Sequence, residues 1–327
     1  MNHPATVVGI DVSKDSLAVC YQVANKVQHL EVSHSKAGFQ QLVRRCGVAC
    51  CYVMEATGVY CLSLAYHLVE HGAQVAVLNP LVVRRFIQMH LGKGKSDRKD
   101  AQWLLRYGQQ QPLPVWQPEE PVLVECRQLE QVMEQFIRQR TMVRNSLQAL
   151  PHQPVVSATA RKRLQQTLKH LDQQIQALEA DLLALLEQHY LREMPLLCSI
   201  PGIGRKTAAQ LLLFAKGFAH VENYRQLIAK AGLCPREYSS GSSVRGKTRI
   251  TRVGGSLIRS KLFMCSFAAK QSNAACKALY DRLVAKGKNG KVALVAVCNK
   301  LLKQACAIVQ SGTPYQAEFS SKLALNP

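Results

Sequence analysis

Long apolar runs and signal-peptide features are missing from this sequence. No stretch approaches the roughly 18 uninterrupted apolar residues that a membrane-spanning helix needs. The first residues, MNHP, are not a charged region followed by an apolar one, so they do not resemble a secretory signal. We therefore expect a cytoplasmic protein without a membrane partner.

The sequence also lacks the cysteine spacing of a metal scaffold. Its twelve cysteines include no C-x-x-C pair, which is the usual seed of a structural zinc site. A disulfide scaffold is not expected either, because 327 residues are enough for about two domains with cores of their own. In a reducing compartment most of these cysteines should be buried thiols.

Acidic residues are scarce, since 42 basic side chains stand against 21 acidic ones and the formal net charge is +21 at pH 7. Such an excess attracts polyanions, of which nucleic acid is the commonest large one. The excess is concentrated toward the carboxyl end, where only Glu237 and Asp281 oppose the bases between Arg236 and Lys303. Aromatic residues make up only 6%, so base stacking should not be the main binding mode.

The segment up to residue 118 has an α/β pattern. Residues 7–12 and 17–23 are β-branched runs that could pair antiparallel. Residues 51–54 and 74–78 are compact apolar runs of the buried-strand type, and the stretch 59–71 between them is helical in pattern. A strand, helix, strand order predicts a crossover connection and a sheet with parallel members.

Two heptad repeats follow a proline-rich linker at residues 112–121 and are separated by a break at residues 151–154. They predict an antiparallel helical hairpin that binds a partner helix, although a plain helical linker packed on its own chain has the same pattern. The first repeat has Cys126, Met133, Arg140 and Leu147 at a, with Leu129, Phe136, Val143 and Leu150 at d. The second has Leu168, Ile175 and Leu182 at a, with Leu164, Leu171, Leu178 and Leu185 at d.

Four acidic residues stand out among apolar neighbours. Asp11 lies in the first predicted strand, Glu55 ends another, and Asp97 and Asp100 are three residues apart after a plausible N-cap, Ser96. Hard cations such as Mg²⁺ prefer carboxylate oxygens as ligands. Two such cations side by side can hold the attacking and the leaving oxygen of a phosphoryl transfer. Taken singly, each acid could instead be a turn former, a surface charge or a favourable charge at a helix N-terminus. Taken together, they favour a metal site.

These acids belong to an ordered set of motifs that resembles the DEDD insertion-sequence transposases. The motifs are residues 9–14 (GIDVSK), residues 55–58 (EATG), Asn79 with Pro80, and residues 95–101 (KSDRKDA). The resemblance implies an RNase H-like, RuvC-like catalytic domain at 1–118, a coiled-coil hairpin for oligomerisation at 119–192 and a mainly helical, basic domain at 193–327. It also implies that Asp11, Glu55, Asp97 and Asp100 bind Mg²⁺.

Two loops in the carboxyl-terminal third could hold phosphate. Residues 199–207 (SIPGIGRKT) form a Pro-Gly-x-Gly turn before an apolar helix, so backbone N–H groups at Gly202 and Gly204, with Lys206, could face a phosphate. A glycine-capped turn without a ligand has the same pattern. Residues 238–247 (YSSGSSVRGK) could be a phosphate nest, a flexible linker or the seat of a serine nucleophile. The bases and hydroxyls expected to contact nucleic acid there are Arg236, Ser242, Ser243, Arg245, Lys247, Arg249 and Arg252.

The family resemblance assigns the nucleophile to this second loop. It implies that Ser240 attacks a DNA phosphate and forms a covalent phosphoserine, although the adjacent Ser239 also fits the motif. It further implies target and donor DNA, a structured bridge RNA that pairs with both, and self-assembly into a dimer or tetramer. We therefore expect an RNA-guided DNA recombinase or transposase. The alternatives are a metal-dependent junction nuclease without a serine nucleophile, and a non-catalytic nucleic-acid scaffold.

Overall fold

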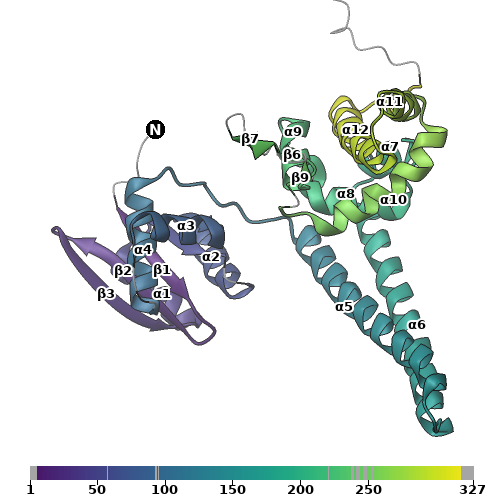
Figure 1. Ribbon diagram of the computed structural model, residues 1–327. Coiled ribbons are helices and arrows are strands. Elements are labelled where there is room, and N and C mark those ends of the chain that lie inside the picture. Colours follow the sequence, from purple (N-terminus) through teal and green to yellow (C-terminus); the bar gives the residue numbers. More distant parts are fainter. Residues whose placement is uncertain are drawn as a thin grey trace, which may run out of the picture. The chain divides into compact units, whose positions relative to one another are not determined.

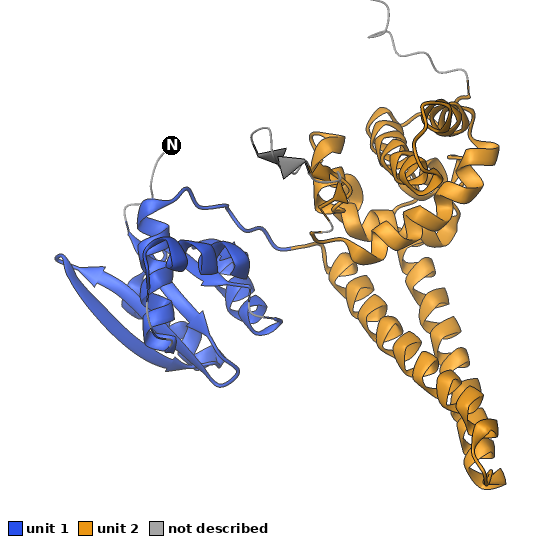
Figure 2. Cartoon of the chain, in the orientation of Figure 1, with its two compact units in different colours: residues 1–118 blue, residues 119–327 orange. Residues whose placement is uncertain are grey.

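The computed structural model divides the chain into two compact units, Met1–Pro118 and Glu119–Pro327 (Figure 2). It describes residues 6–56, 58–92, 94, 96–219, 221–236, 239–240, 244–245, 249–251 and 253–317. For residues 239–240 and 244–245 it describes the backbone alone. Each unit has its own buried core and is considered by itself.

The first unit is built on a five-stranded mixed sheet with the order β3-β2-β1-β4-β5. The strands are β1 (Val7–Val12), β2 (Ser16–Val23), β3 (Lys26–Ser33), β4 (Cys51–Glu55) and β5 (Gln74–Leu78). β1 pairs antiparallel with β2 and parallel with β4, as the sequence predicts, and β4 pairs parallel with β5. This mixed α/β sheet is consistent with an RNase H-like domain.

Helices cover both faces of the sheet, as Figure 1 shows. α1 (Lys36–Cys46) and α2 (Tyr60–Glu70) pack on the face that carries Ile10 and Met54. α3 (Pro80–Met89) and α4 (Asp97–Gln110) pack on the opposite face, which carries Val7 and Val53. Because side chains alternate along a strand, the odd-numbered residues of β1 and β4 face α4.

Two long helices, α5 (Pro121–Ala149) and α6 (Ala158–His189), lie side by side at the start of the second unit (Figure 1). A short 3₁₀ turn, Leu150–His152, ends the first, and Ser157 caps the second by accepting a hydrogen bond from the Ala160 N–H. Every predicted a and d position is buried or half-buried. Their function as an oligomerising coiled coil stays a prediction.

The remaining helices pack around one core, which also includes the base of the α5–α6 pair through Leu123, Cys126, Leu182 and Leu186. These helices are α7 (Glu193–Cys198), α8 (Arg205–Ala215), α9 (Tyr224–Lys230), α10 (Ser256–Ser272), α11 (Ala274–Ala285) and α12 (Gly290–Ser311). α12 is long and apolar enough to cross a membrane by composition, but half of it is buried against its neighbours, as in the core helix of a globular domain. A separate helical domain from residue 193 therefore remains a prediction.

Candidate functional site

Asp11 and Glu55 occupy neighbouring positions on the two central parallel strands. The β1–β4 register pairs Ile10 with Met54, so the next residues on each strand are Asp11 and Glu55. Both lie on the face that carries Val7 and Val53, and both are half-buried at the carboxyl ends of their strands. The sheet register thus brings two predicted ligands together from positions 44 residues apart in the sequence.

Helix α4 runs antiparallel to β1, and two glycines allow its close approach. A Cβ atom at Gly9 would collide with the backbone of Ala101 and Leu105, and one at Gly108 would lie 2.6 Å from a methyl carbon of Val7. Residues toward the end of α4 therefore cover the start of β1, and the start of α4 lies toward the end of β1. This direction brings the first turn of α4, with Asp97 and Asp100, to the carboxyl ends of β1 and β4, where Asp11 and Glu55 lie. We call this end of the sheet the acidic edge.

The first turn of α4 is fixed by the cap that the sequence predicts. Ser96 has extended backbone geometry, and its Oγ accepts a hydrogen bond of 3.3 Å from the Lys99 N–H. Asp97 is exposed and Asp100 is half-buried. Carboxylates are also favourable here because a helix N-terminus carries a partial positive charge.

The four carboxylates have the oxygen chemistry that a divalent cation prefers, and their elements meet at one edge. In the described part of the chain, however, no group of three His, Cys, Asp or Glu side chains is gathered closely enough to hold a metal ion. The elements fit a cation site in position and donor type, whereas the side chains do not form a closed ligand set. All twelve cysteines are free thiols, and eight of them are buried, as expected for a chain whose cysteines pack as small apolar side chains.

His34 links the segments that follow the two acidic strands, which the sequence did not reveal. Its Nδ1 lies 2.8 Å from the Ser13 carbonyl oxygen, two residues after Asp11, and its Nε2 lies 2.9 Å from Ser63 Oγ on α2. α2 begins five residues after Glu55. The imidazole therefore connects the turn after β1 to the helix after β4, with Nδ1–H donating to the carbonyl.

The predicted serine loop lies among four short strands that form two separate two-stranded sheets. β6 (Pro235–Arg236) pairs with β9 (Arg249–Ile250), and β7 (Ser239–Ser240) pairs antiparallel with β8 (Val244–Arg245). In the inner pair, Ser239 is opposite Arg245 and Ser240 is opposite Val244. Ser242, Ser243, Lys247 and Arg252 lie outside the described residues.

Arg236 and Arg249 are directly opposite each other in the outer pair, and both are exposed. Neither guanidinium has a hydrogen-bond or ion-pair partner within the described ranges. Like charges at paired positions of an antiparallel ladder destabilise it unless an anion lies between them. This pair is therefore suited to a phosphate.

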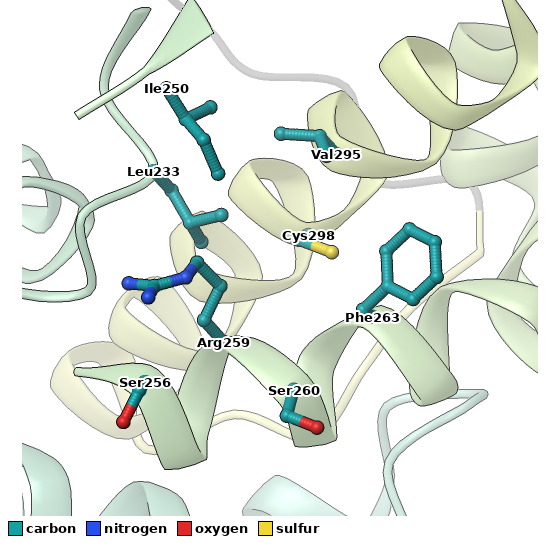
Figure 3. A pocket seen from close by; sticks show the side chains of 8 residues that line it. All are labelled: Leu233, Ile250, Ser256, Arg259, Ser260, Phe263, Val295 and Cys298. Carbon is teal, nitrogen blue, oxygen red and sulfur yellow. The ribbon is translucent and has the colours of Figure 1, made fainter. Parts of the chain in front are cut away.

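An apolar pocket with a volume of about 400 Å³ lies between β9, α10 and α12 (Figure 3). It is lined by Leu233, Ile250, Ser256, Arg259, Ser260, Phe263, Val295 and Cys298. Arg259 donates to the carbonyl oxygens of Ala231 and Gly254 at 2.7 and 2.8 Å. This arginine thus joins α10 to the end of α9, and its charge is used within the fold.

The Pro-Gly-x-Gly turn is also held by contacts within the chain. Gly202 has φ +98°, and a Cβ there would lie 2.7 Å from the Cβ of Ala269 on α10. Gly204 is the N-cap of α8 and has open space around it. Lys206 forms an ion pair of 2.7 Å with Glu179 of α6, and Arg205 bonds Glu187 through two nitrogens. In this conformation the Lys206 ammonium faces a carboxylate.

Comparison with known protein families matches both parts of the chain. Residues 8–153 match the model of the DEDD transposases of the IS110 type, described as "Transposase". Residues 194–281 match a second model, described as "Transposase IS116/IS110/IS902 family". The first matched segment contains the four acidic residues, and the second contains the serine loop.

Similar proteins have related descriptions. The chain is 27% identical to a "Pilin gene-inverting protein" of Moraxella lacunata over 95% of its own length and 97% of that protein. It is 25% identical to a "Transposase for insertion sequence element IS1328" of Yersinia enterocolitica over 95% of itself and 98% of that protein. A 33% match to an IS110 protein of Streptomyces coelicolor covers 50% of this chain and 39% of that protein. The chain belongs to the IS110 family of DEDD transposases, and it is a DNA transposase.

Proposed function

We propose that the chain exchanges DNA strands with four carboxylates, Asp11, Glu55, Asp97 and Asp100, that bind Mg²⁺ at the edge of the sheet. The observation that carries the proposal is the meeting of β1, β4 and the first turn of α4 at one edge. A bound divalent cation would supply charge neutralisation for the reacting phosphate oxygens. The chain's own contribution is to hold the carboxylates on rigid elements, with α4 fixed against β1 at Gly9.

The proposed nucleophile is Ser240. Its Oγ attacks a DNA phosphorus atom, the bond from phosphorus to the 3′ oxygen breaks, and the departing 3′ oxygen takes up one proton to replace the one that the serine hydroxyl gives up to solvent. The DNA then carries a free 3′ hydroxyl while its 5′ phosphate is esterified to the serine. Attack of a 3′ hydroxyl from another strand on this phosphoserine restores the serine and joins the two strands.

Sequence choice is proposed to come from a structured bridge RNA that pairs with target and donor DNA. The protein would then hold backbones through its cationic surface. The exposed pair Arg236 and Arg249 supports this because their mutual repulsion is relieved by a bound phosphate. Self-assembly into a dimer or tetramer through α5 and α6 would bring the serine of one subunit to the carboxylates of another.

The test is a plasmid recombination assay. Its DNA substrate is the insertion element that carries the gene for this chain, together with the DNA on either side of that element. Asp11→Asn and Asp100→Asn should each lower product formation by at least about a hundredfold, because several kcal/mol of transition-state stabilisation depend on a bound cation. Asp281→Asn, which changes the charge equally on the surface of α11, should leave product unchanged. Full activity in the Asp11 and Asp100 variants would refute the metal site and favour a structural function for these acids.

A further inference from the structure

The face of the sheet that carries Asp11 continues across β2 to the edge strand β3. The register pairs Asp11 with Ala18 and Ala18 with Glu31, and in the adjacent row it pairs Gly9 with Cys20 and Cys20 with His29. Cys20 is buried together with Ala101 of α4, which identifies this as the α4 side of the sheet. Glu31 therefore lies two strands from Asp11 on the same face, roughly 10 Å away at the usual strand spacing.

A hollow of about 280 Å³ lies over this outer part of the face. It is lined by Ala18, Val19, His29, Leu30, Glu31 and Arg98. Ala18 lies between Asp11 and Glu31 on this face, and its small methyl side chain leaves a depression in the surface there. Arg98 belongs to the same first turn of α4 as Asp97 and Asp100. The hollow thus adjoins the acidic edge.

Arg98 supplies the positive charge of this hollow. It is exposed, and its guanidinium makes no hydrogen bond or ion pair with any residue that the structure describes. Its charge lies close enough to β2 and β3 to contribute to the lowered pKa of His29, which burial lowers most. Nδ1 of His29 is buried without a hydrogen-bond partner in the described chain. The hollow therefore contains the Arg98 guanidinium and the His29 Nδ1 atom, both without a hydrogen-bond partner among the described residues.

We propose that this hollow binds a backbone phosphate of the DNA strand next to the phosphate held at the acidic edge, with Arg98 as its ligand. A guanidinium can hold two phosphate oxygens through parallel hydrogen bonds, which fixes the strand in orientation as well as position. The exposed Glu31 at the rim opposes the phosphate electrostatically and limits its affinity, which favours release of the strand after exchange. The inference relies on the proposed function only in assuming that DNA reaches this edge.

The experiment follows the arginine Nε–Hε signals of the full-length protein during titration with a dT20 oligonucleotide in EDTA. The signal of Arg98 is assigned by its loss in Arg98→Lys, and that of Arg106, two turns further along α4, serves as a matched control. We expect the Arg98 signal to shift in a saturable way while the Arg106 signal stays in place. Because EDTA removes divalent cations, this result does not depend on the metal site of the proposed function.

Variants of β3 at the rim of the hollow give a second measure, the dT20 concentration at which the Arg98 signal has shifted halfway. Glu31→Gln should lower the dT20 concentration at half-shift about two- to threefold, because a like charge beside the phosphate is removed. Gln28→Glu, on the opposite face of β3, should not change it. An Arg98 signal that stays in place at saturating dT20, while other arginine signals move, would overturn the proposal. A shift with rU20 but not with dT20 would also overturn it, because the site would then serve RNA.

Discussion

Gly9 of β1 lies directly against the backbone of Ala101 of α4, with no room for a side chain between them. This contact sets how closely α4 approaches the sheet, and therefore how far Asp97 and Asp100 lie from Asp11. A residue with no functional group of its own thus determines the geometry of the proposed metal site.

Gly9→Ala should destabilise the protein by about 3 kcal/mol, the upper range for overpacking, because the added methyl group meets backbone atoms that cannot move independently. Urea denaturation would measure the change. Gly204→Ala is the matched control, because a Cβ there meets no atom within 4 Å and its φ is negative. Equal stability of the two variants would contradict the close approach of α4.

His34→Ala should raise the Mg²⁺ concentration needed for half-maximal recombination by roughly tenfold, the lower range for residues that orient metal ligands. The imidazole positions the turn after Asp11 against α2, so its loss loosens both segments. His71→Ala is the control, because the His71 ring bonds the His67 carbonyl one turn back at the end of α2. A metal titration in which the two variants coincide would remove the positioning function of His34.

Leu178→Glu should lower the order of self-assembly measured by sedimentation. Leu178 is a half-buried d position of α6, so a carboxylate there disturbs a partner helix more than the hairpin itself. Gln174→Glu adds the same charge at an exposed position of the same helix. If both variants sediment like the parent protein, the hairpin does not mediate assembly.

Arg236→Gln and Arg249→Gln should each weaken DNA binding. Each should also make the slope of log affinity against log salt concentration less steep by about one unit. The parent affinity should fall on the order of a thousandfold or more between about 50 and 200 mM salt if six or more phosphates are contacted. Arg138→Gln on the exposed face of α5 provides the charge control. A slope that is unchanged in the paired-arginine variants would exclude them from the phosphate contacts.

Much of the first unit is predictable from sequence because its strands are buried and uninterrupted. β1, β2, β4 and β5 follow apolar runs, and Ser96 caps α4 as expected. β3 and its hairpin were not predicted, because the turn uses Ala24 and Asn25 at positive φ rather than a glycine. β3 is also largely exposed, so its apolar periodicity is weak.

The candidate site was predictable only as far as residue type and motif order allow. The four acids could be identified by their neighbours, yet their meeting at one edge depends on strand register and on the direction of α4. His34 had no sequence signal, and Arg98, although it lies within the motif at residues 95–101, had none that pointed to a phosphate. The bond of His34 to Ser63 joins residues 29 apart, and the hollow beside Arg98 is formed by β2 and β3.

The central claim is that strand exchange passes through a serine ester, and denaturing capture of the protein on recombination DNA tests it most directly. Digestion of the trapped adduct followed by mass spectrometry should locate the nucleotide on Ser240. Ser240→Ala should abolish the adduct, whereas Ser239→Ala should retain it. An adduct that persists in Ser240→Ala would contradict the assignment, and strand cleavage without any adduct would establish a metal-dependent nuclease instead.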